Sequence, residues 1–375
     1  MTKPLFVLTE RDLAKLSVMM LLSVILFGLS GLVIMIFLQW ITRQSYAQDS
    51  IDKHGISRVS ASRLGGAAIF ISWLGLLLAG YRSDYFGDAS GGPSGPYWID
   101  WIAVGCCGLL GLVEDLRNNY LSPRCRLYAE FGIFGLAVWV WPVLIPVGLG
   151  IPGLDLLMGL PLIGWLLTVI FCVGFVNSVN MADGANGLMA GVMTIAFSLF
   201  YVSTGEFVYA AMMTACAVFT IFNVISGRLF LGDAGAYGLG ASLAISGLYL
   251  FYENVFSAAF LACLFAYPCI DFIMTLARRY RAGRSIFLPD NDHLHNRLHY
   301  HFQRWLPSKT LANSMTGGLV VASSSGLTAV GYMYQWWPVT SDLWAWLFLF
   351  QCIGYWIVFY LTGLGRRNFQ YELRL

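Results

Sequence analysis

Charged residues are scarce in this chain. Asp, Glu, Lys and Arg make up 11% of the 375 residues, whereas 58% are hydrophobic. A soluble domain has about 25% charged residues, so the composition excludes an ordinary soluble protein. The formal net charge is +2, which argues against nucleic acid as a partner because such proteins carry a strong basic excess. We therefore expect an integral membrane protein that does not bind nucleic acid.

A separate polar domain is also missing. The longest polar segment between apolar stretches is Ala277–Lys309, so we treat residues 1–375 as a single membrane domain. The eight cysteines have neither zinc-ligand nor disulfide spacing, and small buried hydrophobic residues are the better interpretation. The first apolar stretch is too long for a signal-peptide core and has no small-residue cleavage site behind it, so we interpret it as a retained span.

Long apolar stretches are abundant, and they indicate the fold class. A membrane-spanning helix needs ~20 mostly apolar residues, and most of the stretches approach this length. We predict an all-α, polytopic integral membrane protein with about 11 transmembrane helices, or ten if one of the shortest stretches does not cross. The predicted spans are 16–38, 65–80, 97–113, 127–148, 156–176, 188–203, 207–226, 235–251, 255–276, 311–333 and 343–363.

Basic residues are concentrated in alternate gaps between these stretches. The odd-numbered gaps and the tail hold 18 of the 22 Lys and Arg residues, which indicates by the positive-inside rule that these segments are cytoplasmic. Lys3, Arg11, Lys15 and Arg82 are the exceptions. The pattern predicts a multi-pass protein in the cytoplasmic membrane, with an active-site cleft facing the cytoplasm. The predicted cytoplasmic segments are 39–64, 114–126, 177–187, 227–234, 277–310 and the tail 364–375.

Two adjacent carboxylates, Glu114 and Asp115, open the third gap, with Arg117, Arg124 and Arg126 close behind. Adjacent carboxylates at the end of a span repel each other and lose hydration. A divalent cation, a shared proton or the arginines would compensate, and the sequence leaves a ligand site and a juxtamembrane salt-bridge cluster equally open.

The fifth gap has no Lys or Arg but carries a row of amides and one carboxylate. Asn177, Asn180, Asp183 and Asn186 recur at three-residue steps, which would put them on one face of a helix. Glycines follow within the same segment, and they break a helix and allow close approach of the backbone. A helix cap would explain Asp183 but not three asparagines, so we favour a ligand-binding site.

The seventh gap places Asp233 between Gly232 and Gly235. Mg²⁺ takes one or two protein carboxylates and completes its shell with phosphate oxygens and water, and this glycine-flanked carboxylate suits it. A plain helix N-cap is the alternative. Asn223, ten residues earlier, is by itself more typical of a helix-end amide.

The ninth gap holds four of the five histidines. His293 and His295 alternate and Arg297 follows, after a run of arginines. No thiolate completes a tetrahedral zinc site, so we interpret the histidines and arginine as facing diphosphate oxygens. His299 and His301 are expected at the surface.

Taken together, the motifs from Asp49 to Arg297 resemble, in order, those of the polyprenyl-phosphate N-acetylhexosamine-1-phosphate transferases. These enzymes belong to glycosyltransferase family 4 and are more distantly related to the phospho-MurNAc-pentapeptide transferases. The family's first-gap pattern is similar to Arg58 followed by Arg63, Gly65 and Gly66. The resemblance implies transfer of an amino-sugar-1-phosphate from a UDP-sugar to undecaprenyl phosphate, with release of UMP, at the bacterial inner membrane.

The resemblance also implies roles for individual residues and a Mg²⁺ cofactor, with Mn²⁺ as an alternative. It allows a homodimer in the lipid bilayer. The implied catalytic residues are Glu114, Asp115, Asp183 and His293; the implied substrate-binding residues are Arg58, Asn177, Asn180, Asn186, Asn223, His295 and Arg297; and Asp233 is the implied metal ligand.

Four positions depart from the family pattern. Glu114 replaces the first aspartate of the pair, Asn186 replaces an aspartate, Ala236 replaces a serine and Asn296 replaces a histidine. Asn186 therefore cannot act as a nucleophile or base. The peptidoglycan branch has different residues around its Gly-Gly and histidine motifs, so we favour the sugar-1-phosphate branch.

Two other classes of protein fit the sequence less well. A transporter or lipid flippase should carry charged groups near the bilayer midplane, and only Glu130 and Asp271 are carboxylate candidates there. A CDP-alcohol phosphotransferase would need a regular multi-aspartate helix motif, which the sequence lacks. We rank both behind the transferase.

Overall fold

The computed structural model of the protein describes residues 10–44, 61–82, 98–117, 120–283, 285 and 291–372. Within these residues the elements are helices, and the β-structure is limited to an isolated parallel bridge between Ser62 and Leu229. The helices are α1 (Glu10–Ile41), α2 (Gly65–Arg82), α3 (Trp98–Arg117), α4 (Pro123–Val140), η1 (Pro142–Leu144), α5 (Pro152–Met158), α6 (Pro161–Ala182), α7 (Leu188–Thr204), α8 (Phe207–Ser226), α9 (Gly232–Tyr252), α10 (Ala258–Leu264), α11 (Ala266–Arg281), α12 (Leu294–Trp305), α13 (Lys309–Val321), η2 (Ala322–Gly326), α14 (Leu327–Met333) and α15 (Trp344–Glu372).

The structure confirms the all-α, polytopic membrane fold. Five helices in the described part of the chain are long and apolar enough to cross a membrane, and a sixth is counted if α10 and α11 form one bent span. The five are α1, α6, α8, α9 and α15. By length and composition these helices fall short of the eleven predicted spans, although each predicted stretch does contain helix.

Five predicted spans are not single straight helices. The stretch 16–38 is kinked at Gly28, where φ is 59°, and the stretch 156–176 crosses the break between α5 and α6. The stretch 127–148 stops being α-helical at Val140, because Pro142 disfavours helical geometry at the residue before it. The stretch 255–276 is divided at Phe265 into α10 and α11, which are bent by 80°. The stretch 311–333 contains the short π-helix η2 between α13 and α14.

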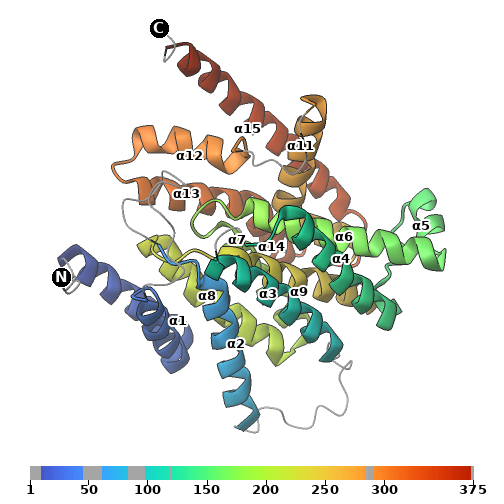
Figure 1. The fold of residues 1–375 in the computed structure, drawn as a ribbon, viewed down its shortest axis with the longest axis horizontal. Coiled ribbons are helices and arrows are strands. Elements are labelled where there is room, and N and C mark those ends of the chain that lie inside the picture. The colour runs from blue at the N-terminus through green and yellow to red at the C-terminus, as the bar shows by residue number, and fades with distance from the viewer. Residues whose placement is uncertain are drawn as a thin grey trace.

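Helix α9 lies at the centre of the bundle (Figure 1). In its most apolar stretch of 18 residues, 94% of the residues are buried. Its sequence explains this position, because glycine and alanine allow neighbouring helices to approach closely. A Cβ on Gly66 of α2 would lie 2.0 Å from the backbone nitrogen of Gly235. One on Gly238 would lie 3.0 Å from the Cα of Gly108 in α3. The glycines of α2, α3 and α9 thus bring three helix backbones into contact.

Backbone hydrogen bonds join the start of α2 to the segment before α9. Gly65 donates to the Phe230 carbonyl at 3.0 Å and Gly66 donates to the Leu231 carbonyl at 2.7 Å. Ser62 donates to the Arg228 carbonyl at 3.0 Å. The first and seventh gaps of the sequence are therefore adjacent, and the Gly-Gly pair supports the segment that carries Asp233.

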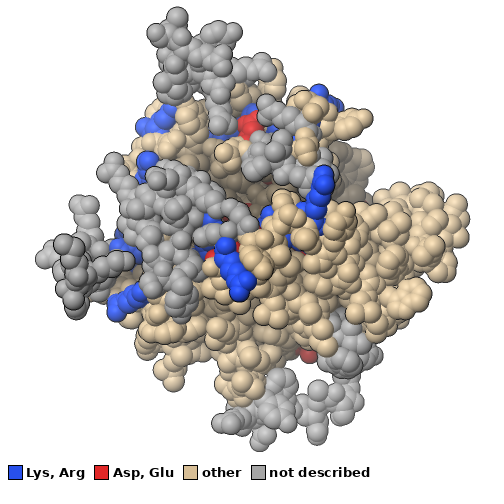
Figure 2. Space-filling model, viewed as in Figure 1, with Lys and Arg blue, Asp and Glu red and all other residues tan. Residues whose placement is uncertain are grey.

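Charge is unevenly distributed over the face seen in Figure 2. Lys and Arg side chains gather in its upper half and around its centre, whereas the part of the lower half that is not drawn in grey shows few charged side chains. Large apolar side chains of α1 and α15, including Leu29 and Trp356, are exposed, as expected for helices that contact lipid.

Candidate active site

Asp115, near the end of α3, holds the first turn of α9. Its Oδ1 accepts a hydrogen bond from the Asp233 backbone N–H at 2.9 Å, and its Oδ2 accepts one from the Ala234 N–H at 2.8 Å. The side chain is 1% exposed. Gly232 has φ 72°, and a Cβ there would lie 2.7 Å from Asp115 Oδ2, so only glycine fits. Asp115, rather than Asp233, therefore caps α9.

Asp233 is the more accessible of these two carboxylates, with a side chain that is 23% exposed. Arg126 lies between two acidic groups, since its Nη1 is 3.8 Å from Asp233 Oδ2 and 3.9 Å from Glu114 Oε1. Glu114 is buried, and its Oε2 accepts a hydrogen bond from the Leu121 N–H at 3.1 Å. The sequence left a ligand site and a salt-bridge cluster open for the acidic pair. The structure shows the salt-bridge contact of Glu114 with Arg126, and Arg126 also contacts Asp233.

Asp183 lies in a turn at the end of α6, not on the helix. The helix ends at Ala182, and Gly187 has φ 72° at the start of α7. The prediction that Asn177, Asn180, Asp183 and Asn186 share one helix face is therefore wrong for the last two, because the glycines of this segment end the helix earlier.

Three carboxylates from three segments are close enough to repel one another. Asp115 and Asp183 lie beyond the ends of the apolar spans. Loss of hydration raises the pKa of Asp183 to about 7, and the negative charges of Asp233 and then Asp115 add to this rise. Burial raises the pKa of Asp115 to about 7, and the charge of Asp233 contributes. A bound cation would relieve this repulsion.

Two of the predicted substrate-binding amides contact neighbouring helices. Asn177 donates to Glu130 Oε2 at 2.5 Å and to the Val173 carbonyl at 2.9 Å. Asn180 donates to the Tyr237 hydroxyl at 3.4 Å. Both side chains are partly buried, in the last turns of α6.

The other two amides join loops to one another. Asn223 accepts a hydrogen bond from the Gly187 N–H at 2.5 Å and donates to the Leu229 carbonyl at 2.6 Å. Asn186 donates to the Ser314 hydroxyl at 3.3 Å. Both are buried, so the contacts that the structure gives them hold the Asp183 turn in place.

The two histidines of the motif lie beside that turn. The rings of His293 and His295 are stacked, with centroids 5.3 Å apart and planes within 6°. His295 Nε2 packs against Gly184, where an added Cβ would lie 2.0 Å away. Burial lowers the pKa of His295 to about 4, so its imidazole is neutral at neutral pH. The histidine motif and the asparagine-rich turn thus form one site.

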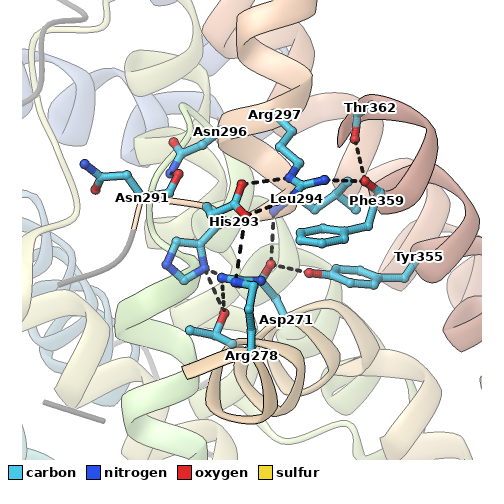
Figure 3. A network of polar contacts seen from close by, with 12 residues as sticks. Asp271, Arg278, Asn291, His293, Leu294, Asn296, Arg297, Tyr355, Phe359 and Thr362 are labelled. Carbon is cyan, nitrogen blue, oxygen red and sulfur yellow. Dashed lines mark hydrogen bonds and ion pairs between the residues drawn. The ribbon is translucent and has the colours of Figure 1, made fainter. Parts of the chain in front are cut away.

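Arg297 takes part in contacts between helices (Figure 3). Its Nε and Nη2 each donate to Asp292 at 2.8 Å, and its Nη1 donates to the Phe359 carbonyl of α15 at 2.5 Å. The guanidinium carbon is 3.6 Å from the centre of the Phe359 ring. His299 is buried rather than at the surface as predicted, because α12 packs on α13. Arg58 lies outside the described residues.

Sequence reasoning missed Asp271 as part of this site. The sequence indicates only a mid-span carboxylate, yet Asp271 accepts a hydrogen bond from Tyr355 and shares one with His293 Nδ1. Its position four residues after Tyr267, which contacts His295, puts both on one face of α11. This four-residue spacing of Tyr267 and Asp271, together with the two alternating histidines, is the sequence pattern that could have indicated the contact.

The donor chemistry of the three aspartates fits a hard divalent cation. Within the described residues, no group of three or more His, Cys, Asp or Glu side chains is arranged as a ready metal cluster. Mg²⁺ binds through one or two carboxylates and completes its shell with phosphate and water, so a preformed protein cage is not required. The mutual repulsion of Asp115, Asp183 and Asp233 favours such an ion.

The fold and this site together define a polytopic membrane protein with a carboxylate–histidine site at the ends of its helices. A model of glycosyl transferase family 4 matches residues 97–251, which run from the segment before α3 to α9 and include the aspartates. The chain belongs to this family.

Its relatives include proteins of two named activities. A phospho-N-acetylmuramoyl-pentapeptide-transferase of Lactiplantibacillus plantarum is 31% identical over 249 residues, covering 62% of this chain and 75% of the relative. One of Staphylococcus carnosus is 25% identical over 303 residues, covering 75% and 89%. A probable undecaprenyl-phosphate N-acetylglucosaminyl 1-phosphate transferase of Bacillus subtilis is 26% identical over 299 residues, covering 74% and 78%.

Proposed function

We propose that this protein transfers an N-acetylhexosamine-1-phosphate, or a related amino-sugar-1-phosphate, from a UDP-sugar to undecaprenyl phosphate. The products are undecaprenyl-diphospho-sugar and UMP, and the reaction would initiate a surface polysaccharide. The observation that carries the proposal is the meeting of Asp115, Asp183 and Asp233 beside the stacked His293–His295 pair, at one end of a membrane bundle.

In the reaction, an oxygen of the lipid phosphate forms a bond to the β-phosphorus of the UDP-sugar. The bond from that phosphorus to the bridging oxygen breaks, and its electron pair leaves with UMP. Both substrates are anionic and repel at short range. Mg²⁺, or Mn²⁺, held by Asp233 and Asp183 would supply positive charge to the phosphate oxygens.

The contacts of Asp115, Arg126 and His293 suggest a different role for each residue in this reaction. Both oxygens of Asp115 accept backbone N–H groups of α9, so we assign it the positioning of Asp233. Arg126, between Glu114 and Asp233, offers a cation at the same place. His293 is the remaining group suited to take a proton. A phosphate's second pKa is about 6, so that proton is present on only part of the lipid substrate at neutral pH.

Support for an N-acetylhexosamine rather than a MurNAc-pentapeptide donor comes from the sequence. The motifs around Gly65–Gly66 and around His293 resemble those of the sugar-1-phosphate branch more than those of the peptidoglycan branch. The names of the relatives cover both donors, so the assay must offer both. A flippase is less well supported, because the aspartates and histidines lie at helix ends and Glu130 and Asp271 have hydrogen-bond partners inside the bundle.

The test is UMP release by the purified chain with undecaprenyl phosphate, Mg²⁺ and a panel of UDP-sugars that includes UDP-MurNAc-pentapeptide. We expect turnover with a UDP-N-acetylhexosamine and loss of it in Asp233→Asn, with unchanged thermal unfolding. Asp342→Asn, which changes a carboxylate in the turn before α15, is the matched control and should retain activity. Near-normal turnover of Asp233→Asn would remove Asp233 from the mechanism, and exclusive use of the pentapeptide donor would replace the proposed substrate.

A further inference from the structure

Asp271 is a buried carboxylate that the mechanism above does not use. It lies in α11 and is 1% exposed. Three groups converge on it (Figure 3): His293 Nδ1 at 2.5 Å from Oδ2, the Tyr355 hydroxyl at 2.6 Å from Oδ1 and the Leu294 N–H at 3.2 Å from Oδ1. A carboxylate inside an apolar bundle is costly unless it is paired, so this arrangement calls for a role.

The partners of Asp271 fix its protonation state and that of the nitrogen facing it. The Leu294 N–H can only donate, and the Tyr355 hydroxyl donates to the same oxygen. Both bonds reach Oδ1 and favour the ionised carboxylate, which can only accept at Oδ2. Beside an ionised Asp271, His293 Nδ1 carries the proton, which leaves Nε2 as the atom of the ring that takes up or releases one.

His295, stacked on His293, has a different kind of partner. The Tyr267 oxygen accepts a hydrogen bond from the His295 backbone N–H at 3.2 Å and lies 2.8 Å from its Nδ1. A hydroxyl can donate or accept at that nitrogen, whereas a carboxylate can only accept. Two residues one turn apart on α11 thus contact two neighbouring rings differently. Of the two rings, His293 is the one hydrogen-bonded to a carboxylate, which stabilises an imidazolium.

We infer that Asp271 is a positioning residue, which fixes the tautomer of His293 so that Nε2 takes the proton of the lipid phosphate during transfer. The proton moves from the phosphate oxygen to Nε2, the oxygen forms the new bond to phosphorus, and the resulting imidazolium is stabilised by Asp271 until it loses the proton to solvent. This inference rests on the proposed function for the substrate but on the Asp271–His293 contact for the tautomer.

Asp271→Asn is the discriminating substitution. The Tyr355 O–H and the Leu294 N–H hold the amide oxygen where Oδ1 now lies, so the amide NH₂ faces His293 Nδ1. That nitrogen must then accept, and the proton moves to Nε2, which can still donate to a phosphate oxygen but can no longer take a proton. We expect kcat to fall by ~10²-fold or more, the range for loss of a positioned proton-transfer group. KM for the UDP-sugar should change by less than about threefold, because uniform binding is retained.

A double-mutant cycle separates positioning from simple structural support. In a His293→Gln background, Asp271→Asn should cost no further activity, since Asp271 acts through His293. A further loss of similar size in that background would show a structural role and overturn the inference. Tyr355→Phe, which removes one donor but keeps the carboxylate, is the control and should lower kcat by no more than about threefold.

Solid-state ¹⁵N NMR of histidine-labelled protein gives a readout that needs no substrate. His293, assigned by its loss in His293→Gln, should have a protonated Nδ1 in the wild-type protein and a protonated Nε2 in Asp271→Asn. A wild-type His293 with its proton only on Nε2 would overturn the inference even if Asp271→Asn fails to fold. If no UDP-sugar supports turnover, the proposed function fails while the NMR result still decides the tautomer.

Discussion

Asp115 uses both carboxylate oxygens to hold the start of α9, and this contact changes what its substitution should do. In Asp115→Asn one oxygen becomes an NH₂ group facing a backbone N–H. We expect a loss of stability of about 0.5–2 kcal/mol, the range for a lost helix cap, and a fall in turnover of ~10²-fold because Asp233 is misplaced. Thermal unfolding and kcat at saturating lipid measure the two effects.

Glu114→Asp is the companion variant. Glu114 contacts Arg126 and the Leu121 N–H but not α9, so a shorter carboxylate can be accommodated by local adjustment. We expect turnover within about tenfold of wild type, which corresponds to ~1.4 kcal/mol on the barrier. Normal activity of Asp115→Asn together with failure of Glu114→Asp would reverse the assignment within the pair.

Gly184 has no room for a side chain, because its added Cβ would lie 2.0 Å from His295 Nε2. In Gly184→Ala the imidazole or the turn must shift, and overpacking of this kind costs about 1–3 kcal/mol. We expect lower thermal stability and lower turnover. Gly132→Ala in α4, whose Cβ would meet nothing within 4 Å, is the control. Equal thermal stability and turnover of the two variants would show that His295 does not pack tightly against Gly184.

At this scale the sequence predicted the acidic and histidine motifs but not how each residue is used. Asp233 was predicted to bind a metal and Asp183 to be catalytic, and both roles stay predictions. Asn186, Asn223 and Arg297 were predicted to bind substrate, and the structure gives them partners within the protein. Spacing along the chain cannot distinguish these outcomes, because an amide or guanidinium suits a ligand and a neighbouring loop equally well.

Among the elements, the 80° bend between α10 and α11 has an identifiable cause. Pro268 cannot donate to the Leu264 carbonyl, and its ring clashes with that group in a continuous helix. The carbonyls near the break are satisfied by side chains of other helices: Ser325 donates to Leu264 at 2.6 Å and Gln351 donates to Cys263 at 3.3 Å. The bend aims α11 so that Tyr267 and Asp271 reach the two histidines.

We therefore predict that Ser325→Ala and Gln351→Leu destabilise the protein. Each removes a hydrogen bond to a carbonyl in the apolar interior, worth about 0.6–2 kcal/mol in membrane proteins. Ser323→Ala is the matched control, since the Ser323 hydroxyl bonds only to carbonyls of its own helical segment. Thermal unfolding in detergent should rank both variants below the control, and equal melting temperatures would show that the bend does not depend on these bonds.

Hydrophobic stretches predicted the helices well, because apolar length is a strong signal in a membrane protein. They did not predict where a helix is interrupted. Pro142 and Pro268 are visible in the sequence, and each marks a break that the predicted spans 127–148 and 255–276 passed over. The π-helix η2 has no proline, and its Ser325 bonds to another helix, so that interruption depends on tertiary contacts.

For the whole molecule, the orientation in the membrane is the property on which the proposed function depends. UDP-sugars are charged and do not cross a bilayer, so the site must face the compartment that contains them. We expect this compartment to be the cytoplasm. The Ala277–Lys309 segment carries seven basic residues, and such a segment stays on the cytoplasmic side. Glu253 lies between α9 and α10, at the opposite end of α9 from Asp233, and should face outward.

Single cysteines at Ser285 and Glu253, on a background with the eight native cysteines replaced, test this orientation. A membrane-impermeant maleimide applied to intact cells should label Glu253→Cys readily and Ser285→Cys only after permeabilisation. Retained UMP release in both variants is the control for folding. Since α9 crosses once between Asp233 and Glu253, labelling of Ser285→Cys from outside together with protection of Glu253→Cys would place the aspartates and histidines away from the cytoplasm, and the UDP-sugar reaction would lose its substrate.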